Sequence, residues 1–260
     1  MSRRFNGTTD RINVGSEFPI DNIGGSPGSR SIVSWFYMTT WGEDIGGTGT
    51  RAGRLWDKHS AIPAGSALFV YDDGPGTTGT APRFSCGVQV YGSTIGRAFA
   101  VDSSIATGSW TFLASTYKPG DGGPRLYLGS LATPSAEVSY SARSGVTRQD
   151  VVTYTSDAAE IGSLGNRVDT ARTFEGWIGH MSVWNGSLSL AHLELLRVQP
   201  HLGWRRVTTG SCLGVWGNDE RWPLAIDRSG LGSHGLLSRT EMTETDRELF
   251  IHQRTSLMRM

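Results

Sequence analysis

The segment Ala159–Arg197 constrains the fold more than any other part of this 260-residue chain. At its centre, residues 174–184 are rich in aromatic and β-branched side chains. Met181 and Val183 fall on one face of this run and Trp184 on the other, which predicts a β-strand with two distinct faces. A chain with this pattern is expected to fold around sheets.

A tight turn and one short helix are predicted to follow this strand. Asn185-Gly186 is a strong turn dipeptide, and either Ser187 or Ser189 can cap the helix. Leucines then recur on one face, so we expect a single short helix near residues 189–197.

This region resembles the end of the laminin-G-like domain, a branch of the concanavalin-A-like lectin/glucanase superfamily. The matching positions are Ile161, Gly162, Phe174, Gly176, Ile178, Met181, Val183, Trp184, Asn185, Leu188, Ser189, Leu193 and Leu196. Gly179 and His180 replace an acidic pair of the family pattern. Stand-alone members of this kind resemble phage-associated proteins. The resemblance implies a fold and says little about function.

Composition agrees with an all-β chain. Its 35 glycines suit many tight turns, and a hydrophobic content of 37% is ample for one core. Lys and Arg (24) balance Asp and Glu (24), which argues against a surface for nucleic acid or anionic membranes. We therefore expect an antiparallel two-sheet jelly-roll sandwich with no nucleic-acid partner and no membrane insertion.

Short strand-like segments recur along the chain at the spacing of stacked sheets. Phe5–Val14 resembles the opening strand of the family. Further strands are predicted at residues 31–40, 54–59, 67–71, 84–91, 97–101, 110–117, 125–129 and 151–155.

The C-terminal segment Cys212–Leu237 resembles a family segment that often precedes the opening strand. It can supply the last strand only if it lies beside Phe5–Val14. We therefore expect one domain over residues 1–238 with adjacent termini, followed by an arm or tail over residues 239–260. As an arm, the tail would dock on a partner through Leu249, Phe250, Ile251, Leu257 and Met258.

No catalytic constellation is expected. Glycoside hydrolases of the superfamily need paired carboxylates on a concave strand, and the formal match, Glu244, Asp246 and Glu248, lies in the polar tail. Cys86 and Cys212 form no disulfide framework, and Cys86 is predicted to be a buried thiol.

Calcium is the one cofactor that the resemblance raises, since many relatives hold it with loop oxygens. Calcium takes six to eight oxygen ligands. The predicted calcium ligands are Asp10, Asp72, Asp73 and Asp169, with Asn166 weighed beside them. Asp-Asp-Gly is also an ordinary turn sequence, so these residues have a structural alternative.

A glycan site needs an exposed aromatic ring with polar groups beside it. The predicted glycan-binding residues are Trp41, Tyr71, Asp72, Asn166 and Asp169, whereas Trp35, Trp110, Trp177 and Trp216 are interpreted as packing residues.

Three functions stay open. The first is a non-enzymatic bacteriophage protein on the virion surface, in contact with itself or other virion proteins. It would be made in the host cytoplasm, because residues 1–15 lack the apolar segment of a signal peptide. The alternative is a carbohydrate-binding adhesin or lectin module, and the third is a glycoside hydrolase.

Overall fold

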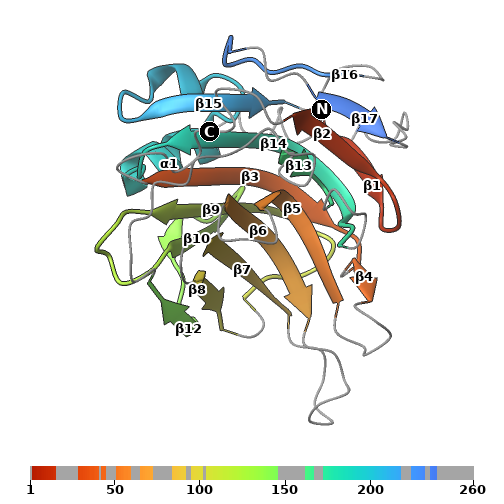
Figure 1. Ribbon diagram of the computed structural model, residues 1–260, viewed down its shortest axis with the longest axis horizontal. Helices are drawn as coiled ribbons and strands as arrows, with labels where there is room; N and C mark the ends of the chain where they lie inside the picture. The colour runs from red at the N-terminus through yellow and green to blue at the C-terminus, as the bar shows by residue number, and fades with distance from the viewer. Residues whose placement is uncertain are drawn as a thin grey trace.

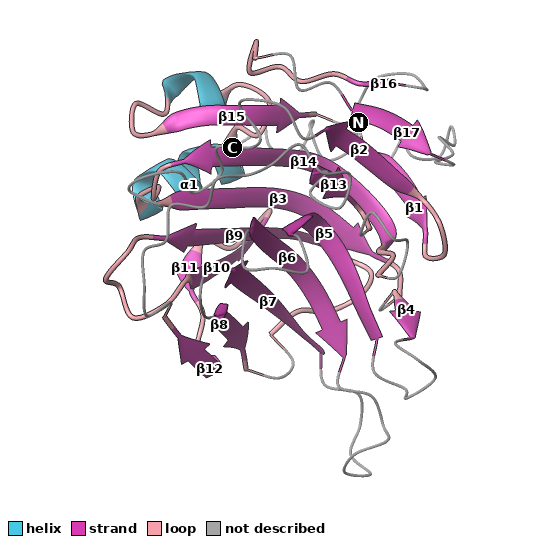
Figure 2. Ribbon diagram, in the orientation of Figure 1, coloured by secondary structure: helices cyan, strands magenta, loops and turns pink. Residues whose placement is uncertain are grey.

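Two antiparallel sheets face each other in the computed structural model (Figures 1 and 2). The structure describes residues 2–15, 29–40, 42–44, 51–59, 65–72, 84–91, 95–101, 104–145, 162–166, 172–217, 224–231 and 235–238. The predicted all-β sandwich with one short α-helix is confirmed within these ranges.

The seven-stranded sheet runs in the order β1-β14-β3-β9-β10-β11, and β15 also pairs with β14. Its strands are β1 (Arg3–Asn6), β3 (Arg30–Met38), β9 (Trp110–Tyr117), β10 (Arg125–Ser130), β11 (Ala136–Glu137), β14 (Glu175–Asn185) and β15 (Ser211–Trp216).

The ten-stranded sheet runs in the order β12-β8-β7-β6-β5-β13-β2-β17-β16, and β4 pairs with β5. Its strands are β2 (Arg11–Gly15), β4 (Glu43–Asp44), β5 (Arg51–His59), β6 (Gly65–Asp72), β7 (Phe84–Tyr91), β8 (Ile95–Ala100), β12 (Tyr140–Ser144), β13 (Gly162–Leu164), β16 (Leu224–Ala225) and β17 (Gly235–Ser238). In this sheet β17 lies antiparallel to β2, with Leu237 opposite Ile12.

The main core lies between the two sheets. Met181 and Val183 of β14 are fully buried there, on the predicted face of their strand. Trp56 from the ten-stranded sheet stacks on Trp216 from the seven-stranded sheet, with ring centroids 6.0 Å apart and planes at 26°. These two indoles join the sheets directly.

A second core lies on the outer face of the seven-stranded sheet, under helix α1 (Leu190–Val198). Leu193 and Leu196 are fully buried there against Trp184 and its neighbours. Ser189 is the N-cap, and its Oγ accepts a hydrogen bond from the backbone N–H of His192 at 3.4 Å. A short 3-10 helix, η3 (Gly203–Arg206), follows α1. Neither helix of the described chain has the length and apolar character needed to cross a bilayer.

The prediction of one opening strand over Phe5–Val14 is wrong. The chain leaves the seven-stranded sheet after β1, turns, and enters the ten-stranded sheet as β2. The side-chain Oδ1 of Asn6 accepts hydrogen bonds from the backbone N–H groups of Thr8 (3.0 Å) and Thr9 (3.1 Å), which favours a turn over a continued strand. Gly7 has the positive φ of 76° that this turn requires.

Some predicted features lie outside the described residues: the strand at 151–155, Trp41, Asp73, Asp169, the Glu244–Glu248 acidic pattern, and the arm over 239–260 with Leu249, Phe250, Ile251, Leu257 and Met258.

Candidate functional site

Four side chains form a row across the outer face of the seven-stranded sheet. Arg4 of β1 is in register with Trp177 of β14, Trp177 with Tyr37 of β3, and Tyr37 with Trp110 of β9. We call these four residues the aromatic row. Their strand neighbours Ile178 and Phe36 point into the inter-sheet core, so alternation places the row on the opposite face.

Successive members of the aromatic row are in contact. The guanidinium carbon of Arg4 lies 5.6 Å from the centroid of Trp177, within the range of a cation–π contact. Trp177 and Tyr37 meet edge to face, with centroids 5.3 Å apart and planes at 82°. Tyr37 and Trp110 are 5.8 Å apart at 59°. Because neighbouring rings are inclined, the row presents faces and edges in turn.

Exposure rises along the row. Trp110 is buried, Tyr37 and Trp177 are half-buried, and Arg4 is exposed. Helix α1 covers the sheet one step away, where Nε1 of Trp35 donates to the carbonyl oxygen of Arg197 at 3.1 Å. Tyr37 and Trp177 pack at the margin of the core under this helix, and both remain partly accessible.

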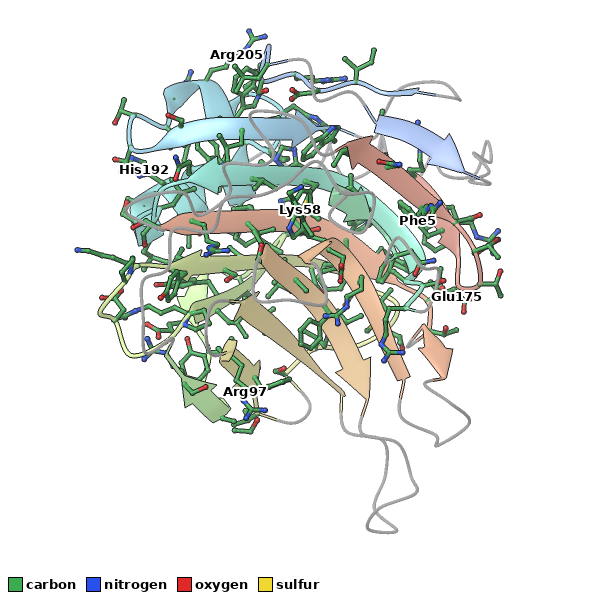
Figure 3. All side chains as sticks on the ribbon, viewed as in Figure 1. Phe5, Lys58, Arg97, Glu175, His192 and Arg205 are labelled. Atoms are coloured by element: carbon green, nitrogen blue, oxygen red, sulfur yellow. The ribbon has the colours of Figure 1, made fainter. Side chains whose placement is uncertain are left out.

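A polar pair lies beside the aromatic row. Asn6 and Glu175 are opposite each other in β1 and β14, one step along the same face from Arg4 and Trp177. The hydroxyl of Thr40 donates to Oε2 of Glu175, which holds this carboxylate in place. Gly7 leaves it room, since a methyl group at Gly7 would lie 2.8 Å from Oε2 of Glu175. Glu175 lies at one end of the sheet, near Phe5 (Figure 3).

This arrangement suits recognition of sugars. Half-exposed aromatic rings can pack against the C–H face of a pyranose, and a fixed carboxylate and a guanidinium can bind its hydroxyl groups. The aromatic row and its polar pair contain one carboxylate, Glu175, whereas glycoside hydrolysis ordinarily uses two.

Asp10 and Asn166, both predicted site residues, have structural roles in this structure. Oδ2 of the buried Asp10 accepts a hydrogen bond from the backbone N–H of Asn6 at 2.9 Å and so closes the turn between β1 and β2. Asn166 is also buried, and its amide donates to the hydroxyl of Thr173 at 2.7 Å and accepts from the backbone N–H of Arg172 at 3.0 Å. The hydroxyl of Thr173 in turn donates to the carbonyl oxygen of Thr8, which connects Asn166 to the turn between β1 and β2.

Trp41, Asp73 and Asp169 lie outside the described residues. Tyr71 and Asp72 end β6 in the opposite sheet, where the structure describes only their backbone. Within the described ranges no three His, Cys, Asp or Glu side chains are grouped so as to hold a metal ion.

The two cysteines also have no part in this site. Cys212 is a free, half-buried thiol whose pKa is raised by burial to about 12. Cys86 lies on β7, with its side chain outside the described part of the structure.

Sequence reasoning missed Arg4, Tyr37 and Glu175 and interpreted Trp177 and Trp110 as packing residues. Trp110 is indeed buried, but Trp177 is half-exposed. Strict alternation from Met181 and Val183 would place Trp177 on the core face, and the irregularity in register between Ile178 and His180 turns it to the outer face. The sequence does not reveal this irregularity.

No protein-family model matches the chain. No curated protein matches it either. Solved structures do resemble it. A candidate carbohydrate-binding protein from Bacteroides ovatus aligns with 92% of this chain at a TM-score of 0.55 and 15% identity. The chain spans 58% of the length of that protein.

Two further structures align less well. The CBM40 of an IT-sialidase from Ruminococcus gnavus, bound to α2,3-sialyllactose, covers 75% of this chain and 96% of its own, at a TM-score of 0.49 and 13% identity. A heptameric SAP-like pentraxin from Limulus polyphemus covers 74% and 83%, at a TM-score of 0.38 and 11% identity. At these identities the comparisons establish the all-β sandwich fold alone.

Proposed function

We propose that this protein is a non-enzymatic carbohydrate-binding protein and that the aromatic row is its binding surface. The row itself carries the proposal. Rings from three strands lie next to one another on the outer face of the seven-stranded sheet, where Tyr37 and Trp177 remain partly accessible, with Glu175 and Asn6 beside them.

The fold supports this proposal, since the Bacteroides ovatus protein of similar fold is a candidate carbohydrate-binding protein. The virion-surface function, self-association and the docking arm stay predictions, because no observation on the described residues bears on them. The aromatic row therefore favours the adhesin or lectin interpretation over the virion interpretation.

Calcium also stays a prediction. Asp10 is the one predicted ligand whose side chain is described, and its Oδ2 already binds the backbone of Asn6. We propose that binding at the aromatic row uses rings, carboxylate and guanidinium without a metal ion.

The test is a glycan array followed by titration of each positive glycan against Trp177→Ala. We expect the variant to raise Kd at least about tenfold, since loss of a central aromatic contact commonly costs more than about 1.4 kcal/mol. EDTA should leave the affinity of the wild-type protein unchanged.

Leu202→Ala is the matched control, because Leu202 is 59% exposed and lies outside the aromatic row. Thermal unfolding of both variants checks that they fold. Wild-type affinity in a folded Trp177→Ala variant, or an array without any positive glycan, would refute the proposal.

A further inference from the structure

The exposed guanidinium of Arg4 belongs to the aromatic row and forms no ion pair with a described carboxylate. Within the described chain, the guanidinium of Arg4 contacts the face of Trp177, and the residue is exposed. A guanidinium carries five N–H donors in a planar fork. The cation–π contact places this fork over the indole of Trp177, at the exposed end of the aromatic row.

The Arg54 side chain shows how the same contact looks when it is structural. Its guanidinium carbon lies 4.5 Å from the ring centroid of Phe69, on the ten-stranded sheet, but Arg54 is 8% exposed and its Nε lies 3.1 Å from Oδ2 of Asp57. Arg54 is thus buried, and its charge is paired with Asp57. Arg4 is exposed and has no ion pair with a described carboxylate.

Arg197 and Arg143 are occupied as well, whereas the exposed Arg205 also lies over an indole, 5.2 Å from the ring centroid of Trp204, but outside the aromatic row. Nε of Arg197 binds Oε1 of Glu194 at 2.9 Å, and Nε of Arg143 donates to the carbonyl oxygen of Pro124 at 3.0 Å. Among the described residues, no carboxylate or carbonyl oxygen accepts a hydrogen bond from the guanidinium of Arg4, which lies beside the exposed rings of the aromatic row.

We infer that the aromatic row binds an acidic glycan, with an anionic group of the sugar held by Arg4. This inference rests on the proposed function and adds the ligand class. A carboxylate or a sulfate on a sugar packed against Trp177 would face the guanidinium edge, and oxyanions of this shape accept two parallel N–H bonds.

Glu175 gives the bound glycan a direction. Glu175 is the diagonal neighbour of Arg4 in the β1–β14 pair, with a Cα separation of about 7 Å in such a ladder. Its negative charge repels an anionic group and accepts hydrogen bonds from hydroxyl groups. An acidic sugar is therefore favoured in one orientation, with its anion at Arg4 and its hydroxyl groups toward Glu175.

The ligand is expected to be longer than one sugar. Four neighbouring strands span three gaps, about 14 Å in all, which exceeds a single pyranose ring. A chain that lies across the strands would reach from Arg4 to the ring of Tyr37 and beyond.

The experiment compares matched acidic and neutral ligands. Oligogalacturonate and its methyl ester differ in the carboxylate charge and in one methyl group per carboxyl, and sulfated and unsulfated dextran oligomers differ only in sulfate. Calorimetry or interferometry measures each with the wild-type protein, Arg4→Ala, Arg4→Lys and Arg97→Ala. Arg97 is an exposed arginine on β8 of the opposite sheet, distant from Glu175 in Figure 3, and serves as the charge-matched control.

We expect the wild-type protein to prefer the acidic member of at least one pair. Arg4→Ala should weaken binding of that member about fivefold more than binding of its neutral partner, the size of a solvent-exposed ion pair. Arg4→Lys should recover part of the affinity, and Arg97→Ala should match the wild-type protein. The preference should shrink as salt rises, because exposed charge pairs are screened.

The pair that responds identifies carboxylate or sulfate as the anion. A preference for neutral glycans, or an Arg4→Ala variant that weakens acidic and neutral members equally, would overturn the acidic-glycan inference while the proposed function stands. If no glycan binds, or Trp177→Ala binds every ligand as the wild-type protein does, the proposed function falls and takes this inference with it.

Discussion

Glu194 and Arg197 fasten helix α1 to the seven-stranded sheet. Arg197 donates to Glu194 and to the carbonyl oxygen of Ser130, and Oε2 of Glu194 accepts the backbone N–H of Ser135 at 2.9 Å. The hydrogen bond from Arg197 is the largest cause that lowers the pKa of Glu194, from its usual 4.5 to about 2. The carboxylate is thus more stable in the folded protein than in the unfolded chain.

A pKa that is lowered by folding stabilises the protein above the ordinary pKa and loses this effect as pH falls. We expect the free energy of unfolding of the wild-type protein to exceed that of Glu194→Gln above about pH 4.5, and this difference to shrink between pH 4.5 and 2. Urea unfolding of both proteins at several pH values measures it. A difference that does not change with pH would contradict this role.

Helix α1 is stabilised by the packing of its buried leucines against the sheet, because its intrinsic stability is small. Nine residues are too few for an independent helix in water, so packing must supply the stability. Leu193 and Leu196 are fully buried against the sheet, whereas Leu190 at the start of the same helix is 48% exposed. The two leucine environments give a matched comparison within one element.

Leu196→Ala should lower the free energy of unfolding by about 2–5 kcal/mol, because it removes buried methyl groups and leaves a cavity. Leu190→Ala should change it by less than about 0.5 kcal/mol, as expected of an exposed position. Chemical unfolding of both variants compares the two values. Equal effects would mean that the helix is not docked as described.

The two sheets are joined by a core that draws residues from both. Trp56 and Trp216 are each fully buried and stack across the interface, so this pair depends on the correct packing of one sheet on the other. A substitution at this contact should change the stability of the whole molecule, since neither sheet can form the contact alone.

Trp56→Ala should destabilise the protein by about 3–5 kcal/mol, the usual range for a buried aromatic side chain. Near-ultraviolet circular dichroism should also lose intensity, because the variant lacks one of two stacked indoles. A variant with wild-type stability would show that this stack does not carry the inter-sheet packing.

Much of the fold could be predicted from the sequence because strand faces follow alternation. Met181, Val183 and Trp184 occupy the predicted sides of β14, and the helix capped by Ser189 follows. The break between β1 and β2 could not be predicted from hydrophobic pattern, since it depends on side-chain hydrogen bonds of Asn6.

The candidate site was predicted less well than the fold. Alternation from Met181 and Val183 would place Trp177 on the core face, and the irregularity between Ile178 and His180 that turns it outward has no signal in the hydrophobic pattern. Pairing of Arg4 with Trp177 joins segments distant in the sequence, and no local pattern reveals such a partner.

The aromatic row exists only in one alignment of four strands. Because side chains alternate, a slip of one residue in β1, β3, β9 or β14 would point that strand's member of the aromatic row into the interior. A ligand that requires the complete row would therefore discriminate between correctly paired molecules and misaligned ones. Retention on an immobilised sugar would then report native folding during purification or refolding.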